Sequence, residues 1–184
     1  NYHDSPLPKY AGVNATTWAI INQEKEHGVS WHEMVEKLDA GVILEQPQFN
    51  IHQDDTVVDL NLKCYSAAIK SFKHFVHKII NDDVAYQVQN LEKRSYVPLH
   101  KKPEGGGIFQ WHNTAEEIYA LYRGLRYYPF DNPVACPKIK LDHELYICHE
   151  LKVTQRNHNH SEIGVLLECN SDELVITTST NNVV

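Results

Sequence analysis

The chain has 184 residues, of which 42% are hydrophobic and 22% charged, and its formal net charge is −7. This composition is typical of a globular protein and allows one sizeable domain or two small ones, while the negative charge argues against a nucleic-acid-binding surface over the whole chain. No apolar run has the length of a membrane span, and four widely spaced cysteines without a C-x-x-C motif indicate reduced thiols, so we expect a cytoplasmic protein without a signal peptide.

The first twelve residues combine side chains of catalytic type with a rigid loop. Asn1 and His3 stand two residues apart, so an extended segment points both to the same side. Two prolines and a glycine within the next nine residues predict an irregular, rigid loop. If Asp39 folds back onto His3, the three side chains can polarise a carbonyl, hold an oxyanion and manage a proton. On the residues alone, a histidine beside such a loop is more often a packing residue.

Short elements follow the loop. We expect a helix at about 14–24 that buries Trp18. Alternation predicts a strand over 29–34, with His32 on the same side as Ser30 and Met34. Residues 42–51 form the next expected strand, where Pro47 suggests an edge or a bulge. Asp39 lies between these strands in a predicted turn, where a carboxylate is usually only a turn residue.

Residues 56–80 carry the clearest periodic pattern and predict a long helix. Thr56 and Asp59 have the spacing of a capping box at its start. Seven apolar residues recur at steps of three and four, and we expect them to face inward: Val58, Leu62, Tyr65, Ile69, Phe72, Val76 and Ile79. The expected solvated face carries basic residues: Lys63, Lys70, Lys73, His74 and His77.

Residues 81–110 are expected to join two parts of the chain. The run 101–107 ends in three glycines and resembles a linker, since it lacks the Lys-Ser/Thr ending of a phosphate loop. A capping box at Thr114 then begins an amphipathic helix of about three turns. Four short alternating segments predict a small β-barrel: 134–140, 144–153, 163–169 and 173–179.

The pair His158 and His160 has the spacing of two metal ligands on a strand. It lies in a polar run that is typical of a loop, and no third ligand is near in sequence. We therefore expect no metal site.

The motifs of the first 46 residues resemble the second half of the catalytic domain of formyltransferases that use 10-formyltetrahydrofolate. The first is Asn-x-His-x-Ser-x-Leu-Pro-x-Tyr-x-Gly over residues 1–12, and the others follow it in the family's order: Trp18-Ala19-Ile20, Gly28-Val29-Ser30 and Leu38-Asp39-Ala40-Gly41-Val42-Ile43-Leu44-x-Gln46. The family's catalytic Asn, His and Asp match Asn1, His3 and Asp39, at the family's separation of 39 − 1 = 38 residues. Three residues depart from the family pattern in and near the loop, which concerns the subfamily: Pro6, Ala11 and Ala15.

The resemblance implies an α/β fold in two parts. Residues 1–90 would be the C-terminal half of the family's doubly wound sheet domain, residues 91–110 a linker, and residues 111–184 a small OB-like β-barrel, truncated at its end. The first half of the catalytic domain would then be absent from these 184 residues. We therefore expect both ends to be cuts through a larger protein.

The resemblance also implies transfer of a formyl group from 10-formyltetrahydrofolate, a co-substrate, to a primary amine. Asn1, His3 and Asp39 would be catalytic, and Leu38 and Asp39 would contact the folate. The substrate side would involve four further residues: Ser5, Leu7, Pro8 and His32. For His32, an ordinary strand histidine is an equal alternative, and the other three are expected to shape the loop more than to react.

The acceptor is less specified. The wording of residues 1–8 and 28–34 resembles formyl domains of non-ribosomal peptide synthetases, which favours an amino acid bound to a carrier protein. Two alternative acceptors are methionyl-tRNA and nucleotide-linked amino sugars. The acidic C-terminal part disfavours methionyl-tRNA. Hydrolysis of the formyl donor, or a non-catalytic interaction fragment, are the remaining hypotheses.

Overall fold

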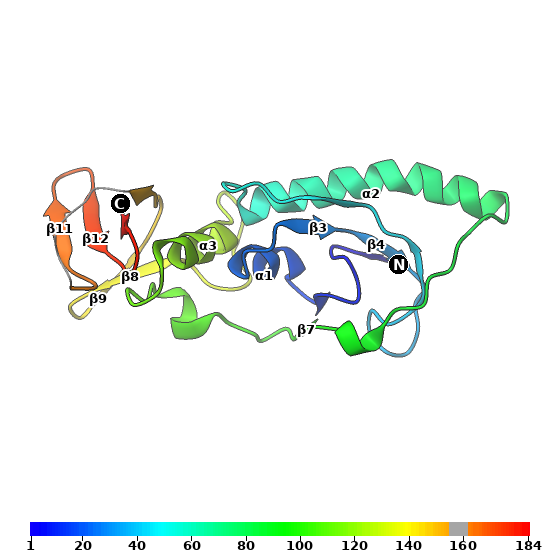
Figure 1. Cartoon of the computed structure of the whole chain (residues 1–184), viewed down its shortest axis with the longest axis horizontal. Helices are drawn as coiled ribbons and strands as arrows, with labels where there is room; N and C mark the ends of the chain where they lie inside the picture. Colours follow the sequence, from blue (N-terminus) through cyan, green and yellow to red (C-terminus); the bar gives the residue numbers. More distant parts are fainter. Residues whose placement is uncertain (155–161) are drawn as a thin grey trace. The chain divides into compact units, whose positions relative to one another are not determined.

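The computed structural model describes residues 1–154 and 162–184. These residues divide into two compact units, 1–101 and 102–184 (Figure 1). The division falls within the segment 91–110, and the functional boundaries expected from the sequence, 1–90 and 111–184, stay a prediction.

Three small sheets and two α-helices make up the first unit. The largest sheet is antiparallel, with its strands in the order β1-β4-β5. Its strands are β1 (Tyr2–His3), β4 (Ser30–His32) and β5 (Ile43–Glu45). The two other sheets are strand pairs: β2 (Ala11–Gly12) parallel to β7 (Tyr96–Val97), and β3 (Glu26–Gly28) antiparallel to β6 (Gln48–Asn50). The single strand expected over 42–51 is thus two strands, interrupted at Pro47, which has no N–H for a ladder.

Helix α1 (Ala15–Ile21) follows the first loop and buries Trp18, as predicted. A short 3-10 turn, η1 (Leu91–Lys93), precedes β7. Because β7 pairs with β2, the chain beyond η1 returns to the first loop.

Helix α2 (Val57–Ile80) has the predicted bounds and its predicted capping box at Thr56, and it runs along the strands of its unit (Figure 1). The prediction of which face of α2 points inward is wrong. The buried residues are instead Val57, Leu60, Cys64, Ala68, Ser71 and Phe75. Five residues of the predicted face are between 48% and 67% exposed: Leu62, Tyr65, Ile69, Phe72 and Ile79. The two stripes differ by one residue in register, which is about 100° of rotation around the helix.

The second unit begins with a 3-10 turn, η2 (Glu104–Gly107), and then helix α3 (Ala115–Leu125), capped by Thr114 and Glu117 as predicted. One side of α3 packs into an apolar cluster with strand residues. Its strands are β8 (Lys138–Leu141), β9 (Glu144–Ile147), β10 (Val153–Thr154), β11 (Leu166–Cys169), β12 (Leu174–Thr177) and β13 (Asn182–Val183).

The strands of the second unit form two separate sheets. β8 and β9 make an antiparallel pair, and the other four have the order β10-β13-β12-β11. Within the described residues these strands form no closed barrel, so the OB-like barrel is not confirmed. His158 and His160 lie outside the described residues. No helix in the described part of the chain is both long and apolar enough to cross a membrane.

Candidate active site

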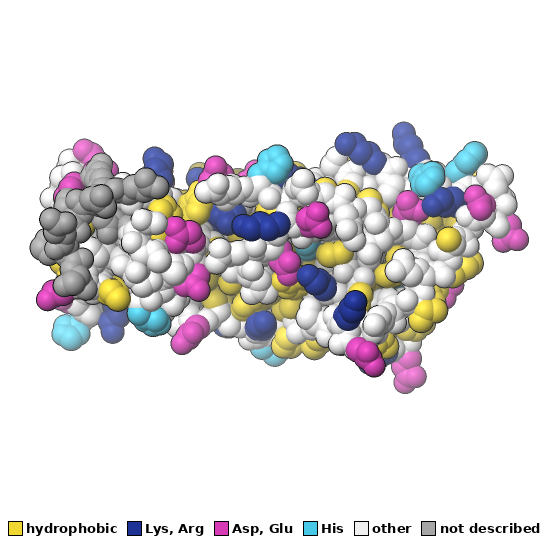
Figure 2. All heavy atoms as spheres, viewed as in Figure 1, with side chains coloured by type: hydrophobic (Ala, Val, Ile, Leu, Met, Phe, Trp, Pro, Cys, Tyr) yellow, Lys and Arg dark blue, Asp and Glu magenta, His cyan; other side chains and the backbone are white. Residues whose placement is uncertain are grey.

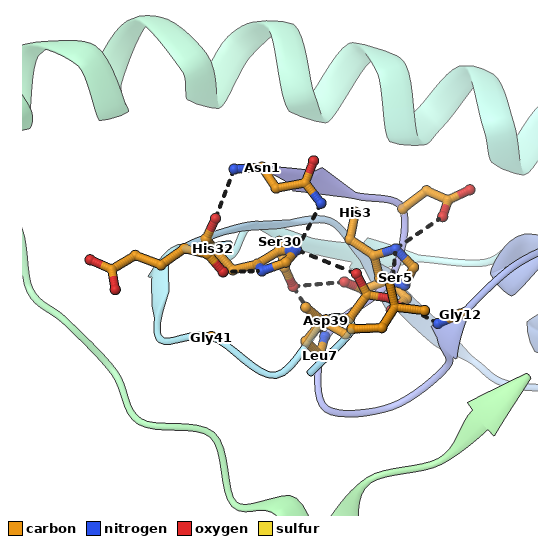
Figure 3. Close-up of polar contacts among 12 residues, drawn as sticks. Asn1, His3, Ser5, Leu7, Gly12, Ser30, His32, Asp39 and Gly41 are labelled. Carbon is orange, nitrogen blue, oxygen red and sulfur yellow. Dashed lines mark hydrogen bonds and ion pairs between the residues drawn. The ribbon is translucent and has the colours of Figure 1, made fainter. Parts of the chain in front are cut away.

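Antiparallel pairing of β1 with β4 brings the first residues of the chain beside His32. His3 lies opposite Ser30, and the His32 backbone N–H donates to the Asn1 carbonyl over 3.0 Å. The side chains of Asn1, His3 and His32 therefore gather at one end of this strand pair (Figure 3).

Asp39 reaches the same place from the turn between β4 and β5. The turn puts Asp39 at a φ of 52°, in the left-handed region that Asp tolerates better than most residues. The Gln89 side chain amide clamps the turn by donating to the carbonyls of Asp39 and Gly41 at 3.0 and 2.6 Å. A Cβ on Gly41 would lie 2.0 Å from the Glu33 carbonyl oxygen, so only glycine allows the turn to pass so close to the end of β4.

The carboxylate of Asp39 is buried and has three neighbours. Its Oδ2 accepts a hydrogen bond from the Gly12 N–H at 2.8 Å and lies 3.8 Å from Nδ1 of His3. Its Oδ1 lies 3.6 Å from Nε2 of His32. The structure thus brings Asp39 together with both histidines.

His3 is 7% exposed, and its ring is held at both ends. Nε2 donates to the Tyr10 carbonyl oxygen at 2.9 Å, so Nδ1 is the nitrogen that can exchange a proton. That nitrogen faces two carboxylates, Asp39 at 3.8 Å and Asp4 at 3.9 Å.

His32 is 2% exposed, and both of its ring nitrogens have partners. Nδ1 donates to the Glu33 carbonyl at 2.9 Å, and Nε2 lies 3.3 Å from Nδ2 of the Asn1 side chain. Burial lowers the pKa of His32, because the charged ring would lose its hydration, and this outweighs the Asp39 carboxylate. The neutral ring with its proton on Nδ1 accepts a hydrogen bond from Asn1.

A polar network holds the loop that follows His3, and sequence reasoning missed it. Ser30 Oγ accepts from the Leu7 N–H at 3.1 Å and donates to the Ser5 carbonyl at 2.7 Å. The Gln46 amide donates to Ser30 Oγ at 2.8 Å and to the Leu7 carbonyl at 2.9 Å. The available signal was a serine within the expected strand 29–34 and a glutamine within the expected strand 42–51, since polar groups that become buried need partners.

The four residues expected on the substrate side differ in access. Ser5 and Leu7 are buried, and Ser5 Oγ donates to the Lys9 carbonyl at 2.7 Å. Pro8 is half-buried and lines an open cavity of about 1130 Å³ with Leu7. His32 is buried between Asn1 and Asp39. Leu38, expected beside the folate, is 54% exposed.

The described residues hold no group of three or more His, Cys, Asp or Glu side chains that could bind a metal ion. The pair His158 and His160 falls outside them.

The formyl transferase family model matches residues 1–76. The chain is 32% identical over 153 residues to the bifunctional polymyxin resistance protein ArnA of Wigglesworthia glossinidia brevipalpis, covering 79% of this chain and 23% of that protein. It is 33% identical over 129 residues to methionyl-tRNA formyltransferase of Clostridioides difficile, covering 70% of this chain and 41% of that enzyme. The chain therefore belongs to the formyl transferase family, and it spans less than half the length of these two relatives.

A solved structure supports the same fold. The N-formyltransferase of Helicobacter canadensis, in complex with folinic acid and dTDP-3-aminofucose, superposes with a TM-score of 0.76. The match covers 100% of this chain and 64% of that chain, at 24% identity. The α/β fold is thus of the formyltransferase type.

Proposed function

We propose that the site transfers a formyl group from 10-formyltetrahydrofolate to a primary amine. The observation that carries this proposal is the buried pair of His3 and Asp39, with Nδ1 and Oδ2 3.8 Å apart and the Asn1 amide at the same end of the strand pair. Membership of the formyl transferase family supports the same chemistry.

The residues divide the work as follows. The amine nitrogen attacks the formyl carbon, and the carbonyl electron pair moves onto oxygen. Protonated His3, through Nδ1, and the Asn1 N–H donate to that oxyanion, and such preset donors are each worth about 3 kcal/mol. Asp39 takes the proton that the amine loses, directly or through a water. The oxyanion then re-forms the carbonyl, the bond to the folate nitrogen breaks, and that nitrogen receives the proton.

The folate and substrate roles remain part of the proposal. Leu38 offers an exposed apolar side chain beside Asp39, which suits contact with a flat ring system. The Arg94 guanidinium donates to the Leu38 carbonyl at 3.0 Å and so supports that turn. Ser5, Leu7 and Pro8 shape the loop around His3, and the cavity next to Leu7 and Pro8 leaves room for a ligand.

We propose an amino acid on a carrier protein as the acceptor, because the sequences of residues 1–8 and 28–34 resemble those of formyl domains of non-ribosomal peptide synthetases. Basic and acidic side chains are interspersed over the described residues on the face drawn in Figure 2, with no continuous basic surface there. This face thus lacks the basic surface that the phosphates of tRNA need, and the net charge of −7 also disfavours tRNA. An amino sugar linked to a nucleotide is the second candidate, since the solved neighbour was crystallised with dTDP-3-aminofucose.

Two further hypotheses remain alternatives: hydrolysis of the formyl donor, and a fragment without catalysis that serves as an interaction domain. An OB-like role for the second unit and a cytoplasmic location stay predictions.

The test uses the longest natural polypeptide that contains these residues, 10-formyltetrahydrofolate and three acceptors: an aminoacyl carrier protein, methionyl-tRNA and an amino-sugar nucleotide. Mass spectrometry is expected to detect a gain of one formyl group on the carrier-bound amino acid. A formyl adduct only on another acceptor corrects the acceptor. Release of formate without any formyl adduct would contradict transfer and support hydrolysis of the formyl donor. Absence of folate binding would support the hypothesis of a non-catalytic fragment.

A further inference from the structure

The imidazole of His32 is buried in the site, yet the proposed reaction gives it no step. It is 2% exposed, and both ring nitrogens are engaged within the protein, which leaves no ring atom free for a substrate. A buried polar ring with two defined partners is suited to orient a neighbour.

The hydrogen bonds of His32 define its tautomer. The Glu33 carbonyl oxygen can only accept, so Nδ1 of His32 carries the proton of that 2.9 Å bond. In the neutral ring, Nε2 then has a lone pair. The Asn1 amide N–H at 3.3 Å is its donor, and the second neighbour of Nε2, Oδ1 of Asp39, lies farther away at 3.6 Å and has no proton to give as a carboxylate. The Asn1 side chain thus has its nitrogen turned toward His32.

The orientation of Asn1 matters because an amide has a donating and an accepting end. Asn1 is exposed, and without that bond its amide is free to present its oxygen in place of its nitrogen to the formyl group. With one N–H bound to His32, the second N–H of the same nitrogen stays available for an oxyanion.

We infer that His32 is a positioning residue, which holds the Asn1 amide with its N–H toward the reacting oxygen. The inference rests on the proposed formyl transfer and reassigns His32 from the substrate side to the support of Asn1. His32 itself contacts no reacting atom.

The first readout does not depend on activity. In protein labelled with ¹⁵N-histidine, the His32 signal, assigned by its absence in the His32→Gln variant, is expected to show the tautomer protonated on Nδ1 near pH 7. Its Nε2 resonance is expected to shift in the Asn1→Ala variant, which removes the donor. A ring protonated on Nε2, or an Nε2 resonance unaffected by Asn1→Ala, would overturn the inference even if formyl transfer is confirmed.

The second readout is kinetic. His32→Leu removes the acceptor and is expected to lower kcat about tenfold, the effect of one lost orienting hydrogen bond, with KM for the folate unchanged. His32→Gln supplies an amide oxygen as acceptor and is expected to restore most of kcat. In an Asn1→Ala background, His32→Leu is expected to cost nothing further, since residues that act as a unit are not additive. A further tenfold loss of kcat from His32→Leu in that background would contradict the inference. An inactive wild type would contradict only the proposed function, and the inference would then be tested by the NMR measurement of the His32 tautomer.

Discussion

Ser30→Ala removes the centre of the network that holds the loop after His3. Ser30 is fully buried, and its hydroxyl joins two backbone groups, the Leu7 N–H and the Ser5 carbonyl, to the Gln46 amide. Three hydrogen bonds disappear with the oxygen. The two backbone groups keep a bond to each other at 3.0 Å, so the loss is the net value of about 1 kcal/mol for each bond. We expect the free energy of unfolding of the first unit to fall by about 3 kcal/mol.

The assay is urea unfolding followed by tryptophan fluorescence in a Trp111→Phe background. In that background the remaining tryptophans, Trp18 and Trp31, belong to the first unit. The matched control is Ser66→Ala, an exposed serine of α2, for which we expect a change within about 0.5 kcal/mol. A Ser30→Ala loss below about 1 kcal/mol would refute the reasoning, because the network would then contribute no more than a surface site.

Three further predictions concern the same unit. On α2, Leu60→Ala is expected to cost about 2–5 kcal/mol of unfolding free energy and Ile69→Ala less than about 1 kcal/mol, because Leu60 is fully buried and Ile69 is 67% exposed; equal losses in urea titrations would contradict the observed face. Gly41→Ala is expected to weaken folate binding at least tenfold by moving the Asp39 turn, as its Cβ would lie 2.0 Å from a backbone oxygen; calorimetric titration with unchanged affinity would exclude this. Burial lowers the pKa of His27 and His32 below 6.5 in the folded protein, so on acidification the unfolded chain binds protons at these histidines before the folded protein does. The free energy of unfolding is therefore expected to be highest above pH 6.5 and to decrease as the pH falls through the pKa values of the two histidines in the folded protein. Equal urea midpoints at pH 7.5 and pH 5.5 would contradict this expectation.

The sequence predicts a helix or strand well where local residues, such as a capping residue or a regular apolar spacing, determine it. The capping residue Thr56 and the regular apolar spacing defined α2 to within one residue. The choice of its buried face was not local. The helix carries two neighbouring apolar stripes, and only packing against β-strands through Cys64 and Ala68 selects one of them.

In the candidate site, too, the sequence predicts some features, while others depend on contacts between distant segments. The motif placed Asn1, His3 and Asp39 in one group, and the structure brings His3 and Asp39 to 3.8 Å. Their catalytic roles stay a prediction. The supports of the site, Gln46 among them, could not be derived from spacing, because they are hydrogen-bond partners supplied by separate strands and turns. The tautomer of His32 likewise depends on the Glu33 carbonyl, which no sequence pattern specifies.

The most direct test of the account is formyl transfer by the Asp39→Asn variant of the longest natural polypeptide that contains these residues. Asn keeps the size of the side chain and removes the charge that faces His3. The account predicts that transfer from 10-formyltetrahydrofolate falls by at least about 10²-fold, while the circular dichroism spectrum stays near that of the wild type. Transfer at the wild-type rate by that variant would contradict the assignment of this site.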